Sequence, residues 1–474
     1  MSDYLTTVGL EIHAELKTQT KMFCDSKNDP DEARPNVNIC PVCVGHPGTL
    51  PTINKEAVKS VLKVGLAING KLADFTEFDR KNYFYPDIPK GYQLSQYEFP
   101  LVSGGRLRNV AITRVHLEED TATSLHEEGE YSLVDFNRAG VPLMELVTEP
   151  VIRSAKDAGD FARELQLLLR YLGVSDANME KGEMRVEANI SVSKEEGKFG
   201  TKVEVKNLNS FRAVEYAIEY EAKRHIGLLE SGEKIAQETR GWDESIGKTF
   251  SQRRKEESHD YRYFPDPDLP KLSIVGVPEF ELSLLKKEMP KLPGETREHY
   301  LTLGIKSGDV ETLVANRSLS RMFEGISRML PERESLLLAS HYLTSDLVGL
   351  VKKAKKDADI MDFPFTPEAF AELIRMVGGK ELSSRGAKDT LAVMFEKGGS
   401  PRVLATELQL IQKSDMGELA DVVKGIISEQ QKVVADYKSG KMPALQFLVG
   451  QGMKATKGSA NPEVLRELFI SLLK

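Results

Sequence analysis

The chain has 474 residues, of which 40% are hydrophobic and 29% charged, and its net charge is −8. This length predicts about three domains. No apolar run is long enough to cross a membrane and the first residues lack the features of a signal peptide, so we expect a cytoplasmic protein without a membrane partner. The negative charge excludes a generally basic surface, so any nucleic-acid contact must be local.

The first predicted element is a strand over residues 8–16, VGLEIHAEL. With a period of two, the even positions from Val8 to Ala14 are apolar, whereas Glu11 and His13 lie on the opposite face. One interpretation is a sheet whose outer face meets water. The other is a site built from acids and an imidazole, and it requires further strands with the same kind of face.

The three cysteines of the chain all lie in the segment 24–43. They are Cys24, Cys40 and Cys43. A C-x-x-C pair with a further thiol is typical of a structural zinc knuckle, and so few cysteines exclude a disulfide framework. Ser26 stands where a fourth thiolate is expected, so Asp25 or His46 would have to complete a zinc site. The alternative is a site that no longer binds zinc.

Two segments combine aromatic residues with Asp-Pro turns. They are RKNYFYPDIPKGYQLSQ at 80–96 and HDYRYFPDPDLP at 259–270. Rigid loops whose rings cap the core are one interpretation of such segments. The other is a pair of ordered loops at the rim of a polar concavity.

Four further runs repeat the alternation of the first strand. They are RVHLEED at 114–120, PLMELV at 142–147, RVEANISV at 185–192 and KVEVKN at 202–207. Their polar positions carry acids, bases and amides, whereas solvated strands usually carry Thr, Ser or Lys. We therefore expect a sheet face that lines a wet, charged concavity. Its carboxylates suit Mg²⁺, and Lys81 and Lys206 would neutralise phosphates.

Other common catalytic motifs are missing. The segment GWDESIGKT resembles a phosphate-binding loop, but five residues separate Gly241 from Gly247 where that loop requires four. The chain has no G-x-S-x-G motif, and its cysteines look like metal ligands rather than a nucleophile. Metal-assisted phosphoryl chemistry is therefore favoured over nucleophilic hydrolysis.

The spacing of the hydrophobic residues changes after KKEMPKLPGE, from the period of two that is typical of strands to the period that is typical of helices. A second break lies near Gly398, Gly399 and Pro401. We therefore predict an α+β fold in three parts. A large cradle domain with a mostly antiparallel sheet spans residues 1–292, an all-α domain spans 293–400, and a small helical tail spans 401–474.

Several long segments resemble GatB, the B subunit of the glutamine-dependent aspartyl/glutamyl-tRNA amidotransferase. They include FDRKNYFYPDIPKGYQLSQ, VDFNRAGVPLMELVTEP, KNLNSFR and DYRYFPDPDLP. The segment VGQGMKATKGSANPEVLRELF is similar to the family's C-terminal tRNA-contacting domain. The resemblance runs in order from residue 8 to the C-terminus, and the inserted domain of the archaeal relative GatE is not evident.

The resemblance implies a ligase that acts on misacylated Glu-tRNA(Gln) or Asp-tRNA(Asn). ATP phosphorylates the side-chain carboxylate, and ammonia from the amidase subunit, GatA, displaces the phosphate. A small subunit, GatC, completes the implied heterotrimer. The family's catalytic residues map onto Glu11, His13, Lys81, Glu119 and Glu145. All of these except Lys81 are its Mg²⁺ ligands, Lys81 lies near the opening of its ammonia path, and Lys206 and Asn207 are predicted to bind ATP.

Periodicity and resemblance disagree at one position. The period of two favours Glu118, together with Arg114 and His116, whereas the family pattern favours Glu119. A β-bulge at residues 118–120 would reconcile them. Two other functions remain as alternatives, a non-catalytic tRNA-binding scaffold and a free-standing metallohydrolase.

The last predicted element is an amphipathic helix that begins with Asn461 as N-cap and Pro462 as first residue. Leu465 lies on its apolar side. Before this helix, Lys454 and Lys457 are expected in a Gly/Ser/Thr loop. Ammonium groups beside a helix N-terminus favour phosphate, so we predict that the two lysines contact tRNA.

Overall fold

The structure is a computed structural model that describes residues 4–125, 131–254, 261–355, 361–412, 416–456 and 460–473. The chain divides into two compact units, Met1–Pro293 and Gly294–Lys474. The first contains a large mixed sheet and the second is helical, so the predicted α+β class is confirmed. The finer division at residues 292 and 400 stays a prediction. Within the described ranges, no helix is long and apolar enough to cross a membrane.

A ten-stranded sheet forms the centre of the first unit. Its strands are β1 (Leu5–Glu15), β2 (Lys71–Leu72), β6 (Val102–Ser103), β7 (Arg106–Leu107), β8 (Val110–Glu119), β11 (Pro142–Thr148), β12 (Met184–Ser193), β13 (Val203–Leu208), β14 (Glu238–Asp243) and β15 (Lys248–Arg254). Their spatial order is β15-β14-β13-β12-β1-β11-β8-β6-β2, with β7 paired to β8. Only β13 and β14 pair in parallel among the described strands of this sheet. The predicted mostly antiparallel sheet is thus confirmed.

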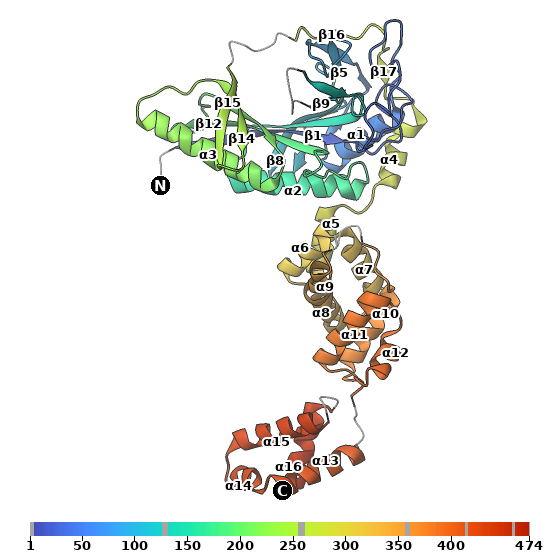
Figure 1. The fold of residues 1–474 in the computed structure, drawn as a ribbon, viewed down its shortest axis with the longest axis vertical. Coiled ribbons are helices and arrows are strands. Elements are labelled where there is room, and N and C mark those ends of the chain that lie inside the picture. The colour runs from blue at the N-terminus through green and yellow to red at the C-terminus, as the bar shows by residue number, and fades with distance from the viewer. Residues whose placement is uncertain are drawn as a thin grey trace. The chain divides into compact units, whose positions relative to one another are not determined.

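Helices cover the apolar face of the sheet. They are α1 (Lys55–Ala67), α2 (Ala155–Leu172) and α3 (Phe211–Glu230). Asn54, Ser154 and Ser210 cap them by accepting hydrogen bonds from the first free backbone N–H groups. Ile12 of β1 and Phe161 of α2 belong to one buried core, which confirms that the even positions of the first strand face inward. Figure 1 shows α2 and α3 along one side of the sheet.

The remaining strands of this unit form three small sheets. They are β9 (Thr123–Leu125) with β10 (Leu133–Asp135), β4 (Asp79–Asn82) with β5 (Tyr92–Ser95) and β16 (Phe264–Pro265), and β3 (Phe75–Thr76) with β17 (Leu272–Ser273). Strands β5 and β16 lie on the side of the large sheet opposite α2 (Figure 1). The unit ends with the 3₁₀-helix η2 (Pro278–Phe280) and with α4 (Leu282–Glu288).

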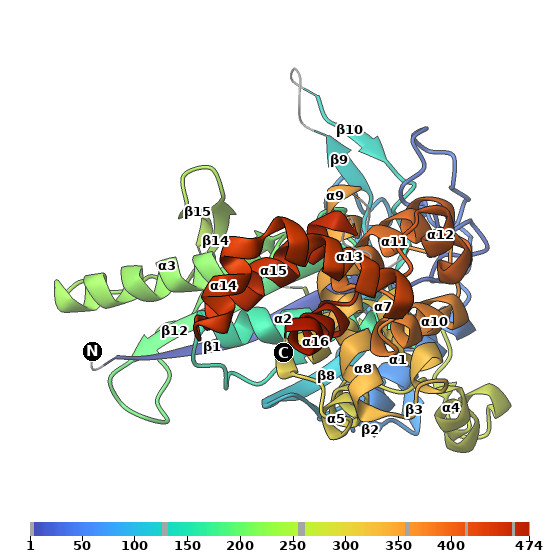
Figure 2. The ribbon, with the colours of Figure 1, turned by 90° about the horizontal axis from the view of Figure 1, so that it is seen from below.

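The second unit begins with α5 (Pro293–Thr302), α6 (Ser307–Ala315), α7 (Arg317–Ser327), α8 (Arg333–His341), the π-helix η3 (Tyr342–Leu347), α9 (Val348–Lys353), α10 (Pro367–Gly378), α11 (Ser384–Lys397) and α12 (Pro401–Glu407). It ends with α13 (Met416–Glu429), α14 (Gln431–Lys438), α15 (Met442–Ala455) and α16 (Pro462–Leu473). The last four helices share a separate apolar core and pack together in Figure 2. The predicted start of α16 is confirmed, because Asn461 Oδ1 accepts a hydrogen bond from the N–H of Glu463 at 2.9 Å.

Candidate active site

One row of polar side chains crosses the middle of the large sheet. The antiparallel register places His13 of β1 opposite Glu145 of β11, and Glu145 opposite His116 of β8. Residues directly opposite each other project from the same face of a sheet. Glu145 Oε2 lies 3.5 Å from His13 Nε2 and 3.4 Å from His116 Nε2. The carboxylate of Glu145 therefore lies between two imidazoles.

Two further carboxylates join this row. His13 Nε2 lies 3.9 Å from Glu11 Oε1 and 3.4 Å from Glu118 Oε1. We call the five residues the acid–imidazole cluster. They are Glu11, His13, His116, Glu118 and Glu145. The ligand atoms of Glu11, His13 and Glu145 lie within 4.8 Å of one another, and so do those of His116, Glu118 and Glu145. Oxygen-rich groups of this kind suit Mg²⁺, so the residues present fit the predicted cation.

The charges in the cluster shift its proton affinities. Burial, together with the charges of Glu145 and Glu187, raises the pKa of Glu11 to about 7. Burial opposes a proton on His13, but the hydrogen bond to Glu145 and the surrounding carboxylates raise the pKa of His13 to about 9. Burial would raise the pKa of Glu145, yet the charge of His116 and hydrogen bonds from His116 and His13 hold it well below its usual range. Protons thus balance the charge where a bound cation would otherwise do so.

Glu119 does not lie in this cluster. Its Oε1 accepts a hydrogen bond from the N–H of Leu94 at 2.8 Å, and its carboxylate pairs with the ammonium of Lys90. The pairing of β8 with β11 continues without a register shift through Glu118 and Glu119, so the bulge that would reconcile the two predictions is absent between these residues. Strand alternation then sends the two carboxylates to opposite faces. The structure brings Glu118 to His13 and leaves Glu119 outside.

Lys81 lies beside the cluster. It belongs to β4, and its Nζ is 5.0 Å from the centre of the Tyr261 ring. Burial would lower the pKa of Lys81, but the negative charges of Glu118 and Glu145 and the neighbouring tyrosines raise it. Lys81 therefore stays a cation at neutral pH, next to the carboxylates with which the sequence predicted it would act.

Lys206 lies at a second group of carboxylates on the same face. Its Nζ is 2.7 Å from Glu187 Oε2 and 3.7 Å from Glu204 Oε1. The ligand atoms of Glu11, Glu187 and Glu204 lie within 4.8 Å of one another, so Glu11 connects this group to the acid–imidazole cluster. Lys206 supplies the positive charge that this second group needs.

Asn207, the other residue predicted to bind ATP, is exposed and has a left-handed backbone with a φ of 61°. The pairing of β12 with β13 shifts register between Val186 and Ala188, opposite this stretch of β13. Such a bulge adds one residue to a strand and returns the next apolar side chain, here Leu208, to the core.

The predicted site left out several residues that the structure gathers. They are His116, Glu187 and Glu204, and they are joined by Glu118, the residue that periodicity favoured over Glu119. The signal for all four was present in the sequence, because each occupies a polar position of an alternating strand. The period of two identified them as one face, but it does not show which strands are neighbours. That information comes only from the pairing order.

The three cysteines also meet in the structure. Their sulfur atoms lie within 4.8 Å of one another, and Cys40 Sγ is 3.9 Å from Cys43 Sγ. Ligands about 2.3 Å from a tetrahedral zinc are about 3.8 Å apart, so the three thiols fit zinc. Ser26 Oγ lies 3.9 Å from Cys43 Sγ, where a fourth ligand is needed. Neither Asp25 nor His46 joins the group of metal-ligating side chains found among the described residues.

A buried cation accompanies these thiols. The side chain of Lys21 is fully buried, and its Nζ donates a hydrogen bond to the backbone oxygen of Phe136 at 3.1 Å. Burial lowers the pKa of Lys21, and the charge of Cys43 opposes that effect. A hydrogen bond from Cys24 lowers the pKa of the Cys43 thiol to about 5, against burial, which raises it. The site thus favours at least one thiolate, the form that binds zinc.

In the tail, Lys454 lies in the last turn of α15, so the prediction of a loop at this residue is wrong. In this stretch α15 packs closely on α16, since a Cβ at Gly452 would lie 3.0–3.5 Å from the side chains of Leu465 and Phe469. Lys454 is exposed. Lys457 lies outside the described residues. The contacts of the two lysines with tRNA stay a prediction.

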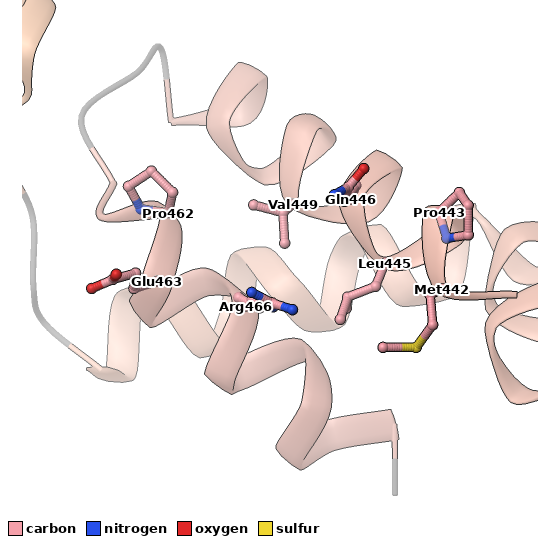
Figure 3. A pocket seen from close by; sticks show the side chains of 8 residues that line it. All are labelled: Met442, Pro443, Leu445, Gln446, Val449, Pro462, Glu463 and Arg466. Atoms are coloured by element: carbon pink, nitrogen blue, oxygen red, sulfur yellow. The ribbon is translucent and has the colours of Figure 1, made fainter. Parts of the chain in front are cut away.

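A pocket of about 380 Å³ lies between α15 and α16 (Figure 3). Its lining consists of Met442, Pro443, Leu445, Gln446, Val449, Pro462, Glu463 and Arg466. Most of these side chains are apolar, and Arg466 and Glu463 add one charge of each sign. No pattern in the sequence indicated this pocket, because it forms only where two helices meet.

Comparison of the sequence with known protein families gives one match in each of the two units. Residues 6–276 match the GatB/GatE catalytic domain family, and residues 323–473 match the GatB domain family. The chain is 42% identical to the B subunit of the aspartyl/glutamyl-tRNA(Asn/Gln) amidotransferase of Persephonella marina, over 100% of both chains. It is 43% identical to that of Thermodesulfovibrio yellowstonii, over 99% of both chains. The chain therefore belongs to the family of aspartyl/glutamyl-tRNA(Asn/Gln) amidotransferase B subunits.

Proposed function

We propose that the acid–imidazole cluster is the centre at which the side-chain carboxylate of misacylated Glu-tRNA(Gln) or Asp-tRNA(Asn) is phosphorylated by ATP and then amidated. The observation that carries this proposal is the pair of metal-capable groups that share Glu145 on one sheet face. His116, Glu118 and Glu145 are buried. Burying a cluster of ionisable groups costs free energy, so its presence favours a functional role. The names of the relatives supply the substrate class.

The division of roles follows from position. Glu11, His13, Glu118 and Glu145 would hold Mg²⁺. When bound, Mg²⁺ neutralises phosphate oxygens and stabilises the charge that develops during phosphoryl transfer. His116 fixes the orientation of Glu145 through its contact of 3.4 Å.

Cations flank this centre on both sides. Lys81 stands beside Glu118 and Glu145, and Lys206 stands beside Glu187. An acid-rich face repels phosphate and carboxylate groups, so two fixed cations favour their approach. Lys206, with Asn207, is proposed to face the ATP phosphates, and Lys81 the opening of the ammonia path.

The proposed assembly has two further subunits. An amidase subunit, GatA, would release ammonia from glutamine, and a small subunit, GatC, would complete the heterotrimer. The exposed Lys454 in the tail would contact the tRNA backbone, and the cysteine group would hold a structural zinc ion. The proposed compartment is the cytoplasm, where the ribosome uses the corrected tRNA.

The test is ATP-dependent amidation by the assembled enzyme, with misacylated tRNA and either glutamine or ammonium as nitrogen donor. We expect product with both donors. The Glu145→Gln variant keeps the side-chain volume but removes the charge, so it should lose phosphorylation of the tRNA-bound carboxylate with both. Product formation at the wild-type rate by this variant would identify the chain as a non-catalytic tRNA-binding scaffold.

A further inference from the structure

Tyr97 and Tyr263 form a stacked pair of rings, a feature that the proposed function does not use. Their ring centres are 4.4 Å apart and their planes differ by 15°. The edge of Tyr261 meets Tyr263 at 6.1 Å, which holds the inner ring in place. Tyr97 is the outer ring, and 64% of it is exposed. Since Tyr263 covers one face of Tyr97, this exposure leaves the other face open to solvent.

The ring pair lies next to the acid–imidazole cluster. Ser95 Oγ donates a hydrogen bond to Glu118 Oε2 at 3.4 Å, and Tyr97 follows two residues later, about 7 Å farther along the chain. The N–H of Tyr97 donates to the buried carboxylate of Asp79 at 3.0 Å, which fixes the backbone at this point. The open face of Tyr97 therefore belongs to a rigid platform at the edge of the site.

A cation lies near these tyrosines and near the cluster. Lys81 Nζ lies 5.0 Å from the centre of the Tyr261 ring. The negative charges of Glu118 and Glu145 raise the pKa of Lys81, so its side chain stays protonated and a positive charge is available near the tyrosines. An open aromatic face beside an available cation is the combination by which proteins bind single-stranded nucleic acid.

We propose that the open face of Tyr97 stacks an unpaired nucleobase at the 3′ end of the charged tRNA. The inference rests on the proposed function. The aminoacyl group is carried by the 3′-terminal ribose, so a nucleobase must lie within one nucleotide of the carboxylate that reacts. A nucleobase on Tyr97 extends the Tyr263–Tyr97 stack by a third ring.

The test uses the assembled enzyme and tRNA in which the 3′-terminal adenine is replaced by 2-aminopurine, a base whose fluorescence falls when it stacks. The wild type should quench this fluorescence, and Tyr97→Phe should do the same because it keeps the ring. Tyr97→Ala should not quench it, and the KM for charged tRNA should rise about tenfold while the KM for ATP stays unchanged. Tyr216→Ala removes a Tyr that is 45% exposed on α3 and serves as the matched control.

Each contrary outcome overturns the inference. Quenching and KM values of Tyr97→Ala equal to those of the wild type would show that no base stacks there. A rise in the KM for ATP alone would assign the ring to the adenine of ATP, and loss of subunit assembly would assign it to a protein interface. Failure of the proposed function is distinct from these, because the wild-type enzyme itself would then form no product.

Discussion

Glu118 and Glu119 are neighbours in the chain, but their carboxylates lie on opposite faces of β8. Glu118 Oε1 is 3.4 Å from His13 Nε2, whereas Glu119 Oε1 accepts a hydrogen bond from the N–H of Leu94. The first environment can hold a cation between carboxylates and imidazoles. The second binds the backbone of β5, a strand that also contacts Glu118 through Ser95 Oγ. Two glutamates at consecutive positions therefore have different roles.

This relationship predicts opposite effects for one substitution. Glu118→Gln should lower ammonium-driven amidation by about 100-fold or more, because it removes a ligand charge at constant volume. Glu119→Gln should leave that rate near the wild-type value and lower the free energy of unfolding by about 1–3 kcal/mol, since Lys90 loses its partner. Amidation assays and urea unfolding check both variants, and the reverse pattern would return Glu119 to the metal site.

The contribution of the acid–imidazole cluster to the stability of the metal-free protein should fall as pH rises from about 5 to about 9. The folded pKa of Glu11 is raised to about 7, so the folded state holds this proton more tightly than the unfolded state, and that advantage is lost between pH 4.5 and 7. The folded pKa of His13 is raised to about 9, so its contribution is full below pH 6.5 and is lost as pH rises through 9.

Mg²⁺ should reverse this trend, because it binds the deprotonated ligands and stabilises the folded state most at high pH. Melting temperatures across this range, with excess Mg²⁺ or with a chelator, measure both effects. Glu11→Gln removes one titrating group and should flatten the metal-free curve below pH 7. If the metal-free curves of Glu11→Gln and the wild type have the same slope below pH 7, the proton balance described for the cluster is contradicted.

Lys81→Met should impair the glutamine-driven reaction about tenfold more than the ammonium-driven one. The fixed charge of Lys81 disfavours ammonium ion at the acidic site, so ammonia stays neutral and nucleophilic on arrival. Without that charge, the carboxylates would hold ammonia from the partner subunit in its protonated form, ammonium, which is not a nucleophile. In the ammonium-driven reaction the donor is added in excess, so the same loss has a smaller effect. Initial rates with the two donors give the ratio. Equal losses would assign Lys81 to phosphate binding instead.

Ser26→Cys should strengthen zinc binding, because it adds a fourth thiolate at the position of Ser26, whose Oγ lies 3.9 Å from Cys43 Sγ. After dialysis against a moderate chelator, we expect this variant to keep more zinc than the wild type. Cys43→Ala should keep none and should unfold at a lower temperature. Metal analysis by mass spectrometry measures the content. The absence of zinc from both the wild type and Ser26→Cys would show that the group binds no metal.

Lys454→Ala should weaken tRNA binding for all tRNA sequences alike and reduce the salt dependence by about one phosphate contact. Lys441→Ala is the matched control, because Lys441 precedes the first residue of α15 and pairs with Asp436 at 2.8 Å. Binding titrations over a range of salt concentrations give both slopes. If the two variants have the same slope as the wild type, α15 does not contact the tRNA backbone.

The sequence predicted local features of the fold well. The period of two assigned Ile12 and His13 to opposite faces of β1, because alternation of side chains is a property of the strand itself. Asn461 and Pro462 located the start of α16, because capping depends on a few adjacent residues. Such features can be predicted without knowing which elements pack against them.

Features that depend on tertiary contacts were predicted less well. The sequence placed Lys454 in a loop because Gly and Thr surround it, but α15 extends to Ala455, with Gly452 packed against α16. The two-residue periodicity of the strand favoured Glu118, and the family resemblance favoured Glu119. The register of β8 with β11 is needed to tell which of the two carboxylates lies in the cluster. No local pattern indicates that His13, His116 and Glu145 lie in one row, since strand order is set by long-range pairing.

The position of β1 at the centre of the sheet has a consequence during synthesis. Both of its neighbours come much later, since β11 begins at Pro142 and β12 at Met184. At roughly 5–20 residues per second, a ribosome needs roughly 7–27 s to make the chain between β1 and the end of its first partner. During that interval an apolar strand has two open edges, a state that favours aggregation. Glu11 and His13 then act as gatekeepers, so the polar residues of the site also protect the nascent chain from mispairing.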